Sequence, residues 1–138
     1  MKALSLRPEW AHLVLTGEKT VEVRSWKTDY RGDVLICSSG MKRKGLISGY
    51  GLIVAELVDI HELTEDDLDE ACLDEMPNEK AYAWVLDNFK DIKPFPVKGQ
   101  LKLFDVDDSE IVYTPAETEE EAEENYITYW KPLFDKFS

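Results

Sequence analysis

The sequence lacks the long apolar run and the export signal that mark membrane and secreted proteins. No stretch approaches the roughly 20 consecutive apolar residues that a membrane-spanning helix needs. Charge and proline interrupt the segment from Met1 to Pro8 too early for a secretory signal peptide. We therefore expect a cytoplasmic protein with no membrane partner.

Cysteine and histidine are also scarce, with two residues of each type. Cys37 and Cys72 have neither a CxxC spacing nor histidine neighbours suited to zinc, so we predict free thiols in a reducing compartment. The carboxylates lie in acidic runs without a recognisable ion-binding loop, and the glycines lack phosphate-loop spacing. The sequence therefore indicates no metal and no cofactor.

Basic residues are outnumbered, since 16 Lys and Arg stand against 29 Asp and Glu, a net charge of −13. This balance argues against tight, sequence-blind binding of nucleic acid, because phosphate contacts rely on basic side chains. Residues 1–50 nevertheless carry nine basic and five acidic residues (+4), and residues 51–138 carry seven and 24 (−17). Two interpretations stay open: an anion-attracting surface on the basic half, or an acidic half that only keeps the protein in solution.

The pattern of apolar residues predicts a single α+β domain, which a chain of 138 residues fits. Strands are predicted at residues 2–6, 20–26, 34–37, 52–60, 82–86 and 101–106, and helices from Pro8 to Gly17, from Thr64 and from Thr118. Pro94 and Pro96 mark an edge or a connector. We expect a small, mostly antiparallel β-barrel with flanking helices and a C-terminal helix.

The C-terminal part, residues 109–138, is predicted to be an acidic segment followed by an aromatic helix packed on the domain formed by residues 1–108. Large apolar side chains recur there at helical spacing: Tyr126, Tyr129, Trp130, Leu133, Phe134 and Phe137. Pro132 should kink or split that helix. We favour packing of the aromatic stripe on the domain, and the alternative is the interface of a homodimer.

One predicted strand carries the residues that suggest a function. Alternation along residues 20–26 puts Glu22, Arg24 and Trp26 on one face, and Lys19 stands at the mouth of the strand. A carboxylate, a guanidinium, an ammonium and an indole together suit a polar, planar ligand such as a nucleobase. The alternative is a surface salt bridge between Glu22 and Arg24, worth about 0–1 kcal/mol and without a function.

The same segment resembles the ASCH domain family. The family signature is a glycine, any residue, a lysine, two further residues, a glutamate, any residue and an arginine, and Gly17, Lys19, Glu22 and Arg24 fill these places. The resemblance extends over residues 3–106 through Tyr30–Ile36, Val58–Asp59 and Pro96–Gly99. It implies a PUA-like pseudobarrel in residues 1–108, with the signature residues lining a cleft beside it.

The first function that the resemblance implies is binding of RNA or of a nucleoside-like ligand in this cleft. The residues expected to bind the ligand are Arg7, Lys19, Glu22, Arg24, Trp26 and Tyr30. Arg24 and Lys19 would meet phosphate or carbonyl oxygens, and Trp26 or Tyr30 would stack on a base. The basic run from Lys42 to Lys44 either adds phosphate contacts or is a solvated hairpin tip.

The second function is that of an amidohydrolase acting on N4-acetylcytidine or a related acylated nucleoside. One small branch of ASCH-like proteins uses a lysine, a threonine and a glutamate for this reaction. Lys19 matches the lysine, Glu22 stands where that branch has threonine, and Glu70 or Glu75 would supply the glutamate. As an enzyme the protein would use Lys19 and Glu22, provided that burial lowers the pKa of the Lys19 ammonium.

Overall fold

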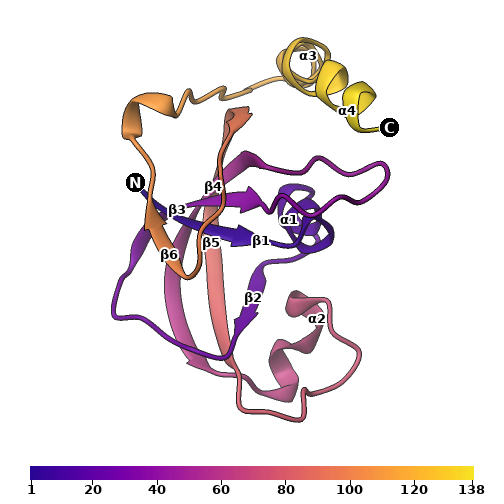
Figure 1. Ribbon diagram of the computed structural model, residues 1–138. Coiled ribbons are helices and arrows are strands. Elements are labelled where there is room, and N and C mark those ends of the chain that lie inside the picture. Colours follow the sequence, from indigo (N-terminus) through magenta and orange to yellow (C-terminus); the bar gives the residue numbers. More distant parts are fainter.

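A six-stranded sheet forms the centre of the protein, which a computed structural model describes over residues 1–138 (Figure 1). The strands are β1 (Lys2–Leu6), β2 (Val21–Arg24), β3 (Gly32–Ser38), β4 (Tyr50–Glu62), β5 (Tyr82–Pro96) and β6 (Leu103–Asp105). Their order is β2-β5-β4-β3-β1-β6, and only β1 and β3 pair in parallel. This confirms the α+β class and the mostly antiparallel sheet, which is open because β2 and β6 are its two edges.

Short helices surround the sheet. They are α1 (Pro8–Leu15), α2 (Leu68–Ala71), α3 (Glu119–Asn125) and α4 (Lys131–Phe137), with the 3-10 turns η1 (Glu65–Asp67) and η2 (Asp108–Glu110) and the π-helical turn η3 (Tyr126–Trp130). Figure 1 shows α2 at one end of the molecule and α3 and α4 at the other. Every helix is too short or too polar to span a bilayer.

The two longest strands, β4 and β5, give the sheet its curvature. Their pairing shifts register at three places, and such irregularities bend and twist a strand. β5 runs to Pro96, ten residues beyond the predicted end at 86. β2 covers only residues 82–85 of β5, so Pro94 lies where β5 is an edge and its missing N–H disrupts no neighbouring strand. Of the two predicted roles for these prolines, the edge is correct.

The core fills both faces of the central strands. β3 is buried on both sides, as its continuous apolar run predicted: Val34 and Ile36 pack with α1, and Leu35 and Cys37 pack on the opposite face with β6. Trp84 of β5 is the largest fully buried side chain and belongs to the α1 side. Beside α1, this apolar core stops at the ends of β1 and β2. Polar side chains lie at that place.

The C-terminal helices contact the α1 side of the core. Trp130, Leu133, Phe134 and Phe137 are partly buried against it. The Phe134 ring meets His12 of α1 edge-on, with 5.8 Å between the ring centroids. The helix divides at η3, just before Pro132, as predicted from that residue. The division of the chain at residue 108 stays a prediction.

Replacing Phe134 with alanine tests whether the aromatic stripe packs on α1. We expect Phe134→Ala to lower the free energy of unfolding by about 1–2 kcal/mol, because full burial of a phenylalanine is worth roughly 1.5–3 kcal/mol and Phe134 is partly buried. Urea unfolding followed by fluorescence measures the change. Ile127→Ala is the matched control, since Ile127 is 55% exposed on the preceding turn. Equal stability of the two variants would contradict the packing.

Candidate functional site

The turn between α1 and β2 directs Lys19 into the interior. Gly17 ends α1 with a φ of +85°, a left-handed conformation that favours glycine, as the sequence predicted. The Lys19 N–H donates to the Leu13 carbonyl at 3.0 Å, and the Thr20 N–H donates to the Glu70 carbonyl at 2.9 Å. These bonds fix the main chain on both sides of Lys19, so the side chain lies between α1 and α2.

Lys19 is a nearly fully buried lysine, 2% exposed. Its Nζ donates to the Ala71 carbonyl of α2 at 2.5 Å, lies 3.8 Å from Glu22 Oε1, and sits 4.8 Å from the centroid of the Trp10 ring. Burial lowers the pKa of the Lys19 ammonium, although the nearby Glu22 carboxylate acts in the opposite direction. An ammonium has three donors, and the Ala71 carbonyl is its one hydrogen-bond acceptor in the protein.

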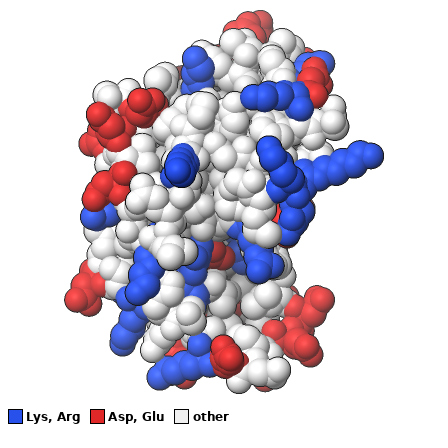
Figure 2. Space-filling model, viewed as in Figure 1, with Lys and Arg blue, Asp and Glu red and all other residues white.

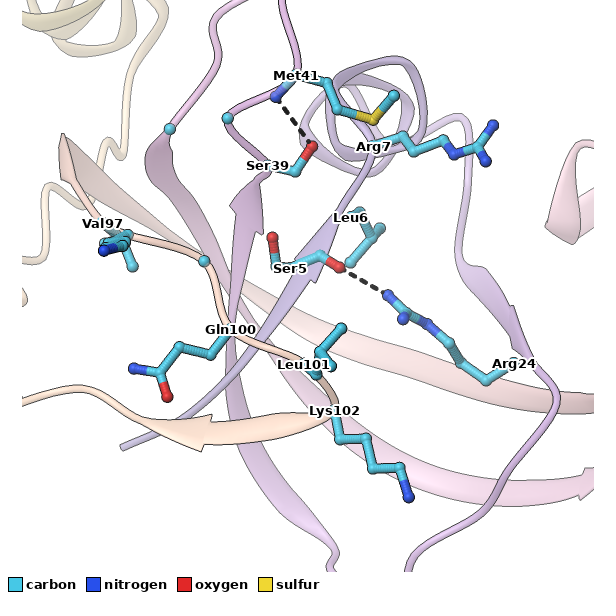
Figure 3. Close-up of a pocket in the computed structure, with 14 residues that line it drawn as sticks. Ser5, Leu6, Arg7, Arg24, Ser39, Met41, Val97, Gln100, Leu101 and Lys102 are labelled. Carbon is cyan, nitrogen blue, oxygen red and sulfur yellow. Dashed lines mark hydrogen bonds between the residues drawn. The ribbon is translucent and has the colours of Figure 1, made fainter.

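Glu22 and Arg24 form a hydrogen-bonded pair on the same face of β2. Arg24 Nε donates to Glu22 Oε2 at 3.2 Å, and Glu22 Oε1 accepts the Val23 N–H at 3.0 Å. Arg24 Nη2 also donates to the Ser5 carbonyl of β1 at 2.9 Å, across the gap between two strands that are not neighbours in the sheet (Figure 3). Because Glu22 is only 5% exposed, this pair is not the surface salt bridge considered as the alternative.

A pocket of about 390 Å³ opens over this network, within the usual size range of ligand sites. It is lined by Ser5, Leu6, Arg7, Trp10, Lys19, Glu22, Val23, Arg24, Leu73 and Pro77. We call it the lysine pocket. The sequence predicted four of its polar residues, Arg7, Lys19, Glu22 and Arg24. It missed Trp10, which lies on α1, and Leu73 and Pro77, which come from the segment after α2.

A second pocket of about 550 Å³ adjoins the first, and Ser5, Leu6, Arg7 and Arg24 line both. Its other walls are the loop after β3, at residues 39–41, and the loop between β5 and β6, at residues 97–102 (Figure 3). We call it the loop pocket. Arg24 therefore stands at the junction of two hollows that together form one cleft.

Two of the predicted ligand-binding residues line neither pocket. Trp26 packs edge-on against Trp84, with 4.7 Å between the ring centroids, and the Tyr30 hydroxyl donates to the Asp33 carbonyl at 2.7 Å. The physical reason is that β2 ends at Arg24, two residues before Trp26, so the alternation used to align Trp26 with Glu22 does not reach it. The structure brings Arg7, Lys19, Glu22 and Arg24 together and leaves both aromatic residues outside.

The acidic residues considered for catalysis also lie elsewhere. Glu70 and Glu75 are exposed, and neither lines the cleft, so Glu22 is the one carboxylate in the lysine pocket. The basic run from Lys42 to Lys44 lines a separate hollow beside the C-terminus, where Arg43 pairs with Glu9 at 3.2 Å.

α2 is held in place by His61 at the end of β4. His61 Nδ1 lies 2.8 Å from Asp59 Oδ2, and Nε2 lies 2.9 Å from Asp67 Oδ2 of η1. Hydrogen bonds to these two carboxylates raise the pKa of His61. Asp67 also accepts the Thr64 N–H in a capping box, so the chain enters α2 along a fixed path. No group of three or more His, Cys, Asp or Glu side chains is arranged to hold a metal ion.

Comparison with known proteins identifies similar chains. The model of the ASCH domain family matches residues 4–131. The crystal structure of ASCH from Zymomonas mobilis is 20% identical, with 92% of this chain and 93% of that chain covered and a TM-score of 0.60. A point mutant of the same protein is 20% identical, with coverage of 92% and 96% and a TM-score of 0.59. At this identity the structural similarity supports the fold alone, and no curated protein matches.

Arg24→Lys tests the connection between β2 and β1. A lysine is a point charge and cannot donate to Glu22 and Ser5 with the fixed fork of a guanidinium, so we expect a loss of about 1–2 kcal/mol in unfolding free energy. Chemical denaturation measures the loss. Arg7→Lys serves as the control, because Arg7 is exposed and its side chain forms no ion pair or hydrogen bond in the protein. If the two variants are equally stable, Arg24 does not hold the strands together.

Proposed function

Because the chain belongs to the ASCH domain family, we propose that its cleft binds RNA or a nucleoside-like ligand through the segment Gly17–Arg24. One observation carries the proposal: two charged side chains, Lys19 and Glu22, are buried, Arg24 beside them is half-buried, and all three still line an open pocket. Burying charge is costly unless each group is paired, and a fold stabilised without a ligand could fill the same space with apolar residues.

The chemistry of the lysine pocket supports a polar, planar ligand. Arg24 has five N–H donors, of which Nε–H and one Nη2–H are engaged within the protein, so others remain for a carbonyl or phosphate oxygen. Glu22 can accept a hydrogen bond from an exocyclic amine. Trp10, Leu73 and Pro77 supply apolar walls that would cover the faces of a ring.

An NMR titration of amide signals tests the proposal. The probes are cytidine, N4-acetylcytidine and a short single-stranded RNA, added separately to the isotopically labelled protein. We expect shifts for residues 5–7, 10 and 19–24. Lys19→Ala should weaken binding by about tenfold or more, because tenfold corresponds to about 1.4 kcal/mol, the order of one hydrogen bond to a charged group.

Lys27→Ala is the control for the loss of one positive charge, since Lys27 is exposed and lines neither pocket. The spectrum of each variant reports whether it folds. Absence of shifts with all three probes, or shifts that persist unchanged in a folded Lys19→Ala variant, would contradict the proposed site.

A second candidate function is hydrolysis of an acylated nucleoside, and the burial of Lys19 favours it. A lysine acts as a base or nucleophile only when deprotonated, and burial lowers the pKa of this one from its usual 10.5. In the reaction water adds to the acyl carbonyl and the nucleoside amine leaves. The cleft offers Glu22 as its only carboxylate, which differs from the lysine, threonine and glutamate of the amidohydrolase branch.

Incubation with N4-acetylcytidine, followed by chromatography of the products, tests this activity. If the protein is a hydrolase, cytidine forms, and Lys19→Arg abolishes the reaction because arginine keeps its proton at every accessible pH. The rate should rise with pH as Lys19 loses its proton and level off below the usual lysine value, because burial favours the neutral form. Product formation by Lys19→Arg would contradict the role of Lys19 in the reaction, and no product from the unaltered protein would leave binding as the function.

A further inference from the structure

The loop pocket differs from the rest of the protein in charge. Its lining contains four basic residues, Arg7, Arg24, Lys98 and Lys102, and no acidic residue. The chain as a whole has 29 acidic and 16 basic residues, so this composition is opposite to the average surface. Figure 2 shows basic side chains across the middle of this face and acidic ones mainly toward its margins.

Three of the four basic side chains of this pocket have no acidic partner within the protein, and the fourth, Arg24, pairs with Glu22. Arg7, Lys98 and Lys102 form no ion pair with any Asp or Glu, and the ammonium of Lys102 contacts only the Trp26 ring, 5.7 Å from its centroid. Clefts lined by charge of one sign concentrate the electrostatic field and attract counter-ions. A hollow with three such groups, and with the remaining donors of Arg24 beside them, therefore attracts an anion.

The walls of the loop pocket are fixed by main-chain contacts. The Val97 N–H donates to the Gly49 carbonyl at 2.9 Å, and the Ser39 N–H donates to the Leu6 carbonyl at 2.7 Å. A Cβ on Gly99 would stand 2.6 Å from Ser5 Oγ and 3.2 Å from Ser5 Cβ, so a side chain at this position would displace either Ser5 or the 97–102 loop. Lys98 and Lys102 are thus carried by a loop that is anchored beside β1 and just before β4.

We propose that the loop pocket is a phosphate subsite and that the complete cleft takes a nucleotide, with the base in the lysine pocket and the phosphate in the loop pocket. This rests on the proposed function, because the lysine pocket must accept a nucleoside. Arg24 lines both pockets, so its guanidinium sits at the junction between sugar and phosphate. Guanidinium and ammonium groups are the usual protein ligands of phosphate oxygens.

The phosphate could belong to a free nucleotide or to an RNA strand. The side chains at the mouth of the loop pocket would interact differently with the two. Met41 and Leu101 lie in the lining from opposite loops, 39% and 93% exposed. Apolar side chains at the mouth offer a surface to the next nucleoside of a strand. A phosphodiester would use these contacts, whereas a monophosphate would leave them free.

Calorimetric titration tests the subsite. The probes are the four ribonucleosides, their 5′- and 3′-monophosphates, dinucleoside monophosphates of the same bases, and inorganic phosphate. We expect a monophosphate to bind about tenfold or more tightly than its nucleoside, with an advantage that decreases as salt increases. Tighter binding of the dinucleotide than of either monophosphate identifies a strand as the source of the phosphate, and equal or weaker binding identifies a free nucleotide.

Two double variants separate the subsite from general electrostatics. Lys98→Ala with Lys102→Ala should remove the advantage of the phosphate and leave nucleoside affinity unchanged. Lys42→Ala with Lys44→Ala loses the same charge from exposed residues of the neighbouring loop that line a different hollow, and should preserve the advantage. A phosphate advantage that survives the first change, or that both changes reduce equally, overturns the inference.

These experiments distinguish failure of the phosphate subsite from failure of the proposed function. Nucleosides and monophosphates that bind equally well would refute the phosphate subsite and leave the lysine pocket as a nucleoside site. Lack of binding by every nucleoside would refute the proposed function. Amide shifts at residues 39–41 and 98–102 with inorganic phosphate test the subsite without any base, and their absence overturns it whatever the nucleosides do.

Discussion

The burial of two charged side chains, Lys19 and Glu22, against the half-buried Arg24 is the constraint on which the rest of the cleft depends. A buried charge without a partner costs several kcal/mol, so each of these groups must keep its contacts. The contacts come from separate parts of the chain: the Ala71 carbonyl after η1, the Ser5 carbonyl of β1, and the Trp10 ring of α1. Movement of any one of these segments would remove a contact from one of the charged groups, and this couples their positions.

The open sheet explains why the charged network has a cavity above it. β2 pairs with β5 alone, and β1 lies between β3 and β6, so the ends of β2 and β1 face each other without main-chain hydrogen bonds. A barrel closed at this point would have used the space for a ladder of hydrogen bonds. Instead the guanidinium of Arg24 crosses the gap, and the two pockets lie on either side of it. The cleft is thus a consequence of incomplete closure.

Local rules predicted the features of the site that depend on neighbouring residues. Gly17 is placed by backbone conformation, and Glu22 and Arg24 by the two-residue period of a strand. The same period failed for Trp26, because nothing local indicates that β2 ends at Arg24. The apolar walls, Leu73 and Pro77, come from a segment distant in sequence. The partners of Lys19 and Arg24 other than Glu22 include main-chain carbonyls, which have no sequence signal of their own.

The close approach of Gly99 to Ser5 also affects how the size of such a cleft can change during evolution. Gly99 lacks a side chain and Ser5 has a small one. A carbon added at Gly99 would lie only 2.6 Å from Ser5 Oγ. A larger residue at either position would force the 97–102 loop outward and widen the cleft. Evolution could therefore retune the size of the accepted ligand through this pair without altering a single charged group, and the two positions should vary together among related chains.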